Sequence, residues 1–165
     1  QLQSRYRVLM KLTKTAKSYE DMIVLGKEFA KCLHGNTKPV LLSLQGQSDA
    51  GKTSLSRGII LVLGCQKPII SPSCFPNEYK TSFGNIYHCD LYTVKDVQHL
   101  NDISFYEKTS KSALSIVEWS NRLNSLTEKS DIFITINKTS EHRVIHFNSN
   151  SQLGCKLLNK LKAIP

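Results

Sequence analysis

Apolar and polar residues follow one another along this chain in blocks that predict a strand and a helix around a glycine-containing turn. Residues 40–44 are almost entirely apolar, as expected for a strand that is covered on both faces of a sheet. After the turn, apolar side chains recur at helical spacing and end at a glycine. These positions are Leu55, Ile59, Ile60, Val62 and Leu63, followed by Gly64. The pattern therefore predicts a strand, a turn and a helix in direct succession.

The rest of the chain alternates in the same way between helical and extended patterns. Ser18, with the acidic Asp21 three residues later, predicts a capped helix start, and this helix is expected to end near His34 and Gly35. Residues 69–75 are expected to be irregular or extended. Further predicted elements are strands at residues 85–91, 113–117, 131–137 and 143–147, a turn at 139–142, and a terminal amphipathic helix at 153–161.

The turn between the first predicted strand and its helix carries a phosphate-binding motif. Residues 46–53 match the pattern G-x-x-x-x-G-K-T, in which backbone N–H groups wrap around nucleotide phosphates. Lys52 would reach the β and γ phosphates, and Thr53 would place its hydroxyl on Mg²⁺. Gly46 and Gly51 permit backbone angles and close approaches that a Cβ would block. The alternative is a glycine-rich turn that binds nothing, but the order of strand, loop and helix favours phosphate binding.

This mixture of elements predicts an α/β fold, a P-loop NTPase-like sandwich whose mostly parallel sheet is extended antiparallel by the late strand pair. The chain has 165 residues, of which 40% are hydrophobic, enough for one globular domain with a sizeable core. We expect residues 10–165 to form this single domain. Residues 1–9 are expected to be a tag, an upstream remnant or a disordered segment.

Several classes of protein are disfavoured by the composition. No apolar run approaches the ~20 residues that a membrane-spanning helix needs, so no membrane association is expected. The five cysteines include no C-x-x-C pair, which disfavours a disulfide framework or a zinc site and suits a cytoplasmic protein. Cys74, His88 and Cys89 could form a metal cluster in the folded chain, although ordinary buried side chains are the simpler interpretation.

The chain is basic, with 22 Lys and Arg residues against 13 Asp and Glu residues and a formal net charge of +9. Such a surface favours nucleic acid, acidic proteins or phosphate ligands as partners, although solvated surface lysines would give the same count. Residues 1–19 contain basic side chains and no acid, a composition that resembles a targeting segment. Alternatively, Met10 is the natural start of the protein.

Two acidic residues follow predicted strands, where α/β sheets place ligand-binding side chains. Asp90 comes after the run at residues 86–89, and Glu118 after the run at residues 114–117. Two carboxylates beside a phosphate loop would form a site for Mg²⁺ and water, although acids at strand ends are also common helix caps. Trp119 could stack near a nucleotide or pack in the core.

A second string resembles a nucleobase-reading motif. Residues 137–140 are Asn, Lys, Thr and Ser, similar to the Asn-Lys-x-Asp pattern that reads guanine. Ser140 stands where the pattern has the carboxylate that accepts from the guanine ring. Adenine is therefore the expected base.

Together these motifs resemble the TsaE family, the small bacterial ATPases of tRNA threonylcarbamoyladenosine biosynthesis, over roughly residues 13–147. His88-Cys89-Asp90-Leu91-Tyr92 is similar to the family's His-x-Asp-Leu-Tyr, and Glu118-Trp119 with Arg122 to its Glu-Trp-x-x-Arg. Similar strings elsewhere are the first helix from Ser18 to Gly26, Arg57-Gly58 after the loop, and Ser71-Pro72-Ser73.

This resemblance implies an ATPase that binds ATP or ADP with Mg²⁺ and supports the TsaD–TsaB complex. That complex transfers a threonylcarbamoyl group to a tRNA adenosine next to the anticodon, so tRNA would be met only indirectly. Lys52, Asp90 and Glu118 would be catalytic, and Thr53 would hold the metal together with both carboxylates. The residues implied at the nucleotide are Tyr19, Gln47, Ser48, Asp49, Ala50, Gly51, Lys52, Thr53, Ser54 and Trp119.

Three residues depart from the family's pattern. Asp49 replaces the usual inner glycine of the loop, and its charge would weaken nucleotide binding unless the side chain points to solvent or a lysine. Ser73 replaces threonine and keeps the hydroxyl, whereas Thr93 replaces an arginine. Two alternatives therefore stay open. Asp49 favours a non-catalytic nucleotide-binding scaffold, while a small-metabolite kinase would need an arginine-rich lid that residues 91–117 lack.

Overall fold

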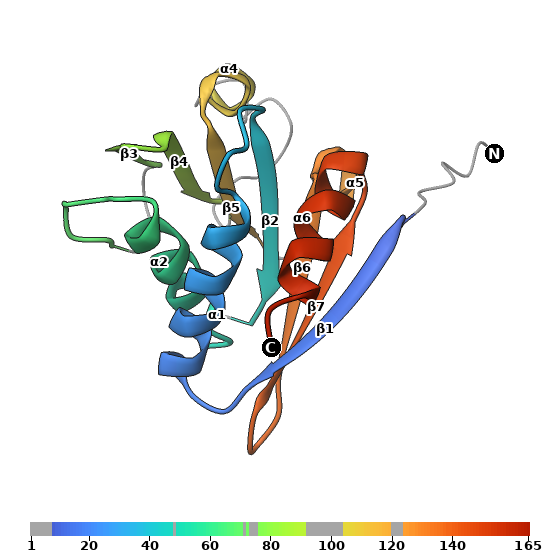
Figure 1. Ribbon diagram of the computed structural model, residues 1–165. Coiled ribbons are helices and arrows are strands. Elements are labelled where there is room, and N and C mark those ends of the chain that lie inside the picture. Colours follow the sequence, from blue (N-terminus) through green and yellow to red (C-terminus); the bar gives the residue numbers. More distant parts are fainter. Residues whose placement is uncertain (1–7, 48, 71, 73–75, 92–103, 120–123) are drawn as a thin grey trace.

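A computed structural model describes residues 8–47, 49–70, 72, 76–91, 104–119 and 124–165, apart from the side chains of residues 119, 124 and 125. These residues form one seven-stranded sheet with helices on both faces (Figure 1). The strands are β1 (Met10–Ala16), β2 (Val40–Gly46), β3 (Asn77–Thr81), β4 (Gly84–Asp90), β5 (Leu114–Trp119), β6 (Ile132–Lys138) and β7 (Arg143–Ser149). The helices are α1 (Tyr19–Cys32), α2 (Lys52–Val62), α4 (Phe105–Lys111), α5 (Asn124–Lys129) and α6 (Gln152–Lys162).

The centre of the sheet is parallel and its margins are antiparallel. Across the sheet the strands lie in the order β1-β7-β6-β2-β5-β4-β3. β2, the strand that leads into the phosphate loop, is parallel to both of its neighbours, and β4 is parallel to β5. The pairs β6–β7, β7–β1 and β4–β3 are antiparallel. The predicted α/β fold is confirmed, with a longer antiparallel part than expected because β1 and β3 also join the sheet.

Two apolar clusters attach helices to the two faces of the sheet. The larger cluster joins α1, α2 and α6 to one face and includes Phe29, Leu55 and Leu158, all fully buried. The smaller cluster joins α4 and α5 to the other face through Phe105 and Leu126. Helices therefore cover β2 on both faces of the sheet. This burial explains why its residues are almost continuously apolar.

Helices α1 and α2 lie side by side and touch through two glycines (Figure 1). A Cβ on Gly26 of α1 would overlap the carbonyl oxygen of Leu55 on α2. A Cβ on Gly58 of α2 would overlap the carbonyl oxygen of Ile23 on α1. At each glycine the backbone of the opposite helix comes too close for a side chain. This close contact fixes the direction of α2 and of the loop at its N-terminus.

Most predicted elements are confirmed. The Oγ of Ser18 accepts a hydrogen bond from the N–H of Asp21 at 3.1 Å and caps α1, which ends at Cys32 rather than at His34. The turn between β6 and β7 is closed by a 2.8 Å hydrogen bond from the N–H of Thr139 to the carbonyl of His142. The terminal helix is present as α6.

Four elements were not predicted, namely β1, β3, α4 and α5. β1 is a lysine-containing edge strand in which exposed and half-buried residues alternate, so its charge obscured its pattern. β3 buries only Tyr79. Among their described side chains, the short helices α4 and α5 bury only Phe105 and Leu126, which leaves little apolar periodicity to detect.

The helices are short relative to the thickness of a bilayer. α1 has 14 residues, whereas about 20 apolar residues are needed to cross the hydrocarbon core. In the described ranges, no helix is long and apolar enough to span a membrane.

Candidate functional site

The phosphate loop, residues 46–53, connects the end of β2 to the start of α2. Gly51 precedes α2 with a φ of 109°, a left-handed conformation that favours glycine. A Cβ on Gly46 would lie 3.0 Å from the carbonyl oxygen of Ile136 on β6, a tight contact that favours glycine where the loop leaves the sheet. The N-terminus of a helix attracts anions through its unpaired N–H groups and its dipole. The loop therefore has the architecture of an anion site.

The first turn of α2 supplies the residues that the motif assigns to phosphate and metal. Lys52, Thr53 and Ser54 are half-buried there. The ammonium of Lys52 donates a hydrogen bond to the carbonyl of Gly46 at 2.5 Å, so the side chain reaches back across the mouth of the loop. The N–H of Ala50 donates to the carbonyl of Gln47 at 2.9 Å and tightens the loop. Among the described residues, the Lys52 ammonium is thus held at the loop by one backbone acceptor, which an anion can replace.

Asp90 and Glu118 are direct neighbours at the carboxyl ends of β4 and β5. Glu118 is also paired with Leu44 of β2, two residues before the loop begins. Aligned residues of neighbouring strands project from the same face of a sheet. On that face, the Oγ of Ser56 from α2 lies 3.4 Å from Glu118 Oε1. The structure therefore brings both predicted carboxylates together on the side of the sheet that α2 covers.

Glu118 is almost fully buried, with 1% of its surface exposed. The Nε2 of His88, itself fully buried, lies 3.5 Å from Glu118 Oε1. Neither ring nitrogen of His88 has a hydrogen-bond partner among the described residues. The sequence places His88 in a motif and in a possible metal cluster with Cys74 and Cys89, and it assigns no role to Ser56. Both residues could have been noticed as polar residues at the buried positions of β4 and α2, which are otherwise largely apolar.

Side chains from α1, β6 and β7 contact the middle of the phosphate loop. Tyr19 donates its hydroxyl to the carbonyl of Asp49 at 3.1 Å. Arg143 donates through Nε to the carbonyl of Ala50 at 2.9 Å, and its Cζ lies 4.3 Å from the centroid of the Tyr19 ring. Lys138 pairs with the Asp49 carboxylate at 2.6 Å. The hydrogen bond and the positive charge of Lys138 hold the pKa of Asp49 below its ordinary value.

A pocket of about 410 Å³ opens beside the loop, at the carboxyl ends of β2 and β6. It is lined by Gln45, Gly46, Gln47, Thr135, Ile136, Asn137 and Lys138. The string that resembles a nucleobase-reading motif is therefore next to the phosphate loop, although Asn137 is 84 residues further along the chain than Thr53. Backbone groups, amides and a hydroxyl around a concave space are typical of a small-molecule site.

Part of the predicted site lies outside the described residues. This applies to Ser48, to Arg122 and to the side chain of Trp119, whose backbone pairs with Gln45 of β2. It also applies to Ser71, Ser73, Cys74, Tyr92 and Thr93.

The possible metal cluster of Cys74, His88 and Cys89 is described only in part. Successive residues His88 and Cys89 project from opposite faces of β4. Within the ranges that the structure describes, no three His, Cys, Asp or Glu side chains are grouped to hold a metal ion.

The sheet order, the glycine-containing loop between β2 and α2, and the acids at the ends of the neighbouring strands define a P-loop NTPase-like fold. The family model of the threonylcarbamoyl adenosine biosynthesis protein TsaE matches residues 16–145. This chain therefore belongs to the TsaE family, as its motifs predicted.

Several relatives support the same assignment. A TsaE protein of Haemophilus influenzae is 29% identical over 142 residues, covering 84% of this chain and 89% of that protein. A TsaE protein of Rickettsia felis is 31% identical over 142 residues, covering 84% of this chain and 82% of that protein. Both are described as tRNA threonylcarbamoyladenosine biosynthesis proteins. The crystal structure of Bacillus subtilis YdiB matches with a TM-score of 0.70 and 21% identity, covering 94% of this chain and 97% of that one, which supports the fold.

Proposed function

We propose that this protein binds and hydrolyses ATP with Mg²⁺ in support of tRNA threonylcarbamoyladenosine biosynthesis. The observation that carries the proposal is the juxtaposition of the phosphate loop with two carboxylates on the face covered by α2. A phosphate loop alone binds a nucleotide, whereas hydrolysis also needs acids that hold the metal and orient water. The family to which the chain belongs supplies the biological process.

The residues around the loop fit a magnesium ion. Thr53, Asp90 and Glu118 offer oxygen donors, which Mg²⁺ prefers. In the described structure, the Glu118 carboxylate contacts a hydroxyl and an imidazole and has the acidic Asp90 as its neighbour in the sheet, so a cation would compensate the charge of the two carboxylates. A bound Mg²⁺ would neutralise charge on the phosphates. Lys52 would hold the β and γ phosphates, and the loop N–H groups from Gln47 to Ser54 would bind the remaining oxygens.

The nucleoside would lie beside the loop, where the structure offers space and polar groups. The pocket at the ends of β2 and β6 has room for part of a nucleotide. Tyr19 lies at the loop through its contact with Asp49, and Trp119 follows Glu118 at the end of β5. Ser140 provides no carboxylate for a guanine ring, so we assign adenine as the preferred base.

The partner in this proposal is the TsaD–TsaB complex, with tRNA met through that complex in the cytoplasm. The formal net charge of +9 suits a surface that meets acidic protein or RNA. Association through such a surface weakens as salt is added.

The deciding experiment is steady-state ATP hydrolysis with Mg²⁺, measured for this protein alone and with the TsaD–TsaB complex of the same organism. Stimulation by the complex would support both the activity and the partner. Bound nucleotide without turnover in either case would overturn the ATPase and leave a nucleotide-binding scaffold. Transfer of the phosphoryl group to a metabolite instead of water would identify a kinase.

A further inference from the structure

The phosphate loop carries a carboxylate of its own, in a place where a nucleotide would add further negative charge. Asp49 has 53% of its side chain exposed, and its carboxylate lies 2.6 Å from Lys138 Nζ. Lys138 is 89 residues further along the chain, at the last position of β6. This distance is shorter than in the described ion pairs Lys111–Glu107, at 2.9 Å, and Lys108–Glu78, at 3.1 Å.

An unpaired carboxylate in this loop would oppose phosphate binding. Like charges repel, and a nucleotide in the loop would bring its phosphates close to this carboxylate. When a carboxylate and an ammonium are in direct contact, their electrostatic effects on a neighbouring charged group nearly cancel. With Lys138 in place, the loop can therefore present its N–H groups and the Lys52 ammonium without an opposing charge.

We infer that Lys138 is a positioning residue of the phosphate loop, which neutralises Asp49 and holds its carboxylate toward β6 so that the loop accepts phosphates. The inference rests on the proposed nucleotide binding. Asp49 in the loop and Lys138 on β6 then act together, because the positive charge of Lys138 compensates the negative charge of Asp49.

The backbone around Asp49 is restrained independently of this ion pair. The hydroxyl of Tyr19 holds the carbonyl of Asp49, and Arg143 holds the carbonyl of Ala50. Arg143 also covers the Tyr19 ring, so α1 and β7 support the loop together. Because the backbone is held in this way, Lys138 has only to direct a side chain.

This arrangement separates ligand affinity from stability. Exposed ion pairs contribute little to folding, so loss of the Lys138 ammonium is expected to leave the thermal midpoint almost unchanged. Without the Lys138 ammonium, the loop carries an uncompensated negative charge, and this charge repels the phosphates of an incoming nucleotide. A change in nucleotide affinity without a change in stability is therefore the signature of the inferred role.

The test is a double-mutant cycle on the dissociation constant of a slowly hydrolysed ATP analogue with Mg²⁺, measured by calorimetry on the full chain. We expect Lys138→Met to weaken binding by about tenfold, equivalent to ~1.4 kcal/mol. Asp49→Asn should bind at least as tightly as the parent. The double variant should lie within about threefold of Asp49→Asn, because the lysine has no charge left to compensate. Lys138→Arg should bind like the parent.

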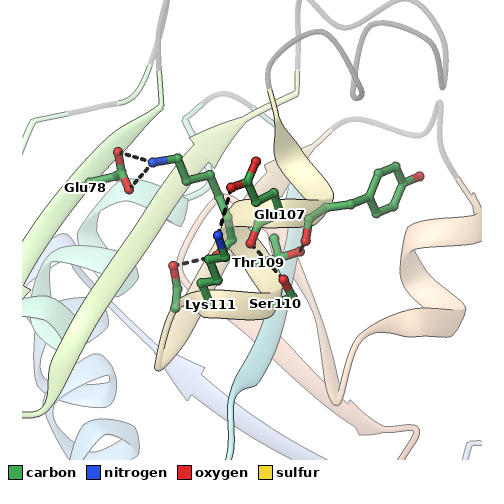
Figure 2. Close-up of polar contacts among 8 residues, drawn as sticks. Glu78, Glu107, Thr109, Ser110 and Lys111 are labelled. Atoms are coloured by element: carbon green, nitrogen blue, oxygen red, sulfur yellow. Dashed lines mark hydrogen bonds and ion pairs between the residues drawn. The ribbon is translucent and has the colours of Figure 1, made fainter.

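The control is Lys108→Met, which removes the same charge from a comparable ion pair. Lys108 and Glu78 have side-chain exposures of 43% and 54%, against 37% and 53% for Lys138 and Asp49. The two dashed lines at the Glu78 carboxylate in Figure 2 are the hydrogen bonds that the Lys108 ammonium donates to its two oxygens, at 3.1 and 3.2 Å. This variant should bind the analogue like the parent.

The outcomes separate the inference from the function on which it rests. If the parent binds no nucleotide, the proposed function fails and the inference with it. If the parent binds and Lys138→Met binds equally well, the inference alone is overturned. If Lys138→Met weakens binding as much in the Asp49→Asn background, Lys138 contacts the nucleotide directly and the compensating role is overturned.

Discussion

Among single residues, Glu118 has the environment least suited to a purely structural role. Glutamate is almost never fully buried unless it is paired, yet Glu118 is 1% exposed. In the described structure its carboxylate contacts Ser56 and the fully buried His88. A buried carboxylate next to a second one, Asp90, and beside a phosphate loop is the arrangement expected of a metal and water site.

Replacement of this carboxylate should therefore affect turnover more than binding. We expect Glu118→Gln to lower the rate of ATP hydrolysis by about 100-fold or more, as is typical when one positioned acid or base is lost. Nucleotide affinity, measured by calorimetry, should change little, because the amide keeps the shape of the side chain. Glu107→Gln, on exposed α4, is the control and should hydrolyse ATP like the parent. Parental turnover by Glu118→Gln would remove its assigned role.

Lys52 should show the opposite pattern, in which binding is lost first. Its ammonium is poised at the loop by the carbonyl of Gly46 alone among the contacts described. Charged hydrogen bonds contribute roughly 1.5–3 kcal/mol, so Lys52→Ala should weaken nucleotide binding by about 10- to 100-fold. Lys27→Ala, at an exposed position of α1, should leave the dissociation constant unchanged. Unaltered affinity in Lys52→Ala would contradict phosphate binding by the loop.

Among the elements, the contact between α1 and α2 has the strictest steric requirement. Gly26 and Gly58 each face a backbone carbonyl of the opposite helix, so neither position has room for a Cβ. In an isolated helix, alanine would be favoured over glycine by about 1 kcal/mol. The packing here demands the less favourable helix former, which indicates that the position of α2 is set by this contact.

We therefore expect Gly58→Ala to destabilise the protein by about 1–3 kcal/mol despite the better helix propensity of alanine. The measurement is the free energy of unfolding in denaturant, with Arg57→Ala as the neighbouring control. Arg57 is exposed on the same helix, and its replacement should change stability by less than about 0.5 kcal/mol. A stabilising effect of Gly58→Ala would show that the helices can separate at no cost.

At the scale of the whole molecule, the phosphate loop is connected to three strands of the sheet and to two helices. It joins β2 to α2 directly, and it is held by Tyr19 of α1, Lys138 of β6 and Arg143 of β7. Because of these contacts, we expect the loop to unfold together with the sheet. Binding should be visible in the global unfolding transition rather than in the loop alone.

Mg²⁺ with ATP at about 100 times its dissociation constant should stabilise the native state by ~2.7 kcal/mol. For a chain of this size the thermal midpoint should rise by roughly 5–10 °C. GTP at the same concentration should give a smaller shift, because Ser140 replaces the guanine-reading acid. Lys52→Ala is the control, and because its affinity is expected to fall about 10- to 100-fold, its shift with ATP should be about half of the parental shift or less. Equal shifts with both nucleotides would contradict the adenine preference.

The sequence predicted the features that depend on neighbouring residues. The cap at Ser18, the strand before the loop, the loop itself and the helix after it are set by residues within a few positions of one another. The same holds for the turn that ends in His142. Elements with few buried side chains, such as β3 and α4, leave almost no apolar period and were missed for that reason.

The candidate site shows where local information ends. The sequence identified Asp90 and Glu118 as acids at the ends of strands, but only the strand order makes them neighbours. The sequence also left the direction of the Asp49 side chain open. In the tertiary structure this side chain points to Lys138 and pairs with it. Ser56 and His88 became relevant only when α2 and β4 met around Glu118.

By itself, then, the sequence determined the phosphate loop, the fold class and the family of this protein, because each depends on short strings whose spacing is local. The tertiary structure decided the pairing of the carboxylates, the support of the loop by β6 and β7, and the inclusion of β1 as an edge strand. Sheet pairing joins residues far apart in the chain through backbone hydrogen bonds that are common to all sequences. The pattern of side chains shows that such strands exist, and only packing of the whole chain decides which of them meet.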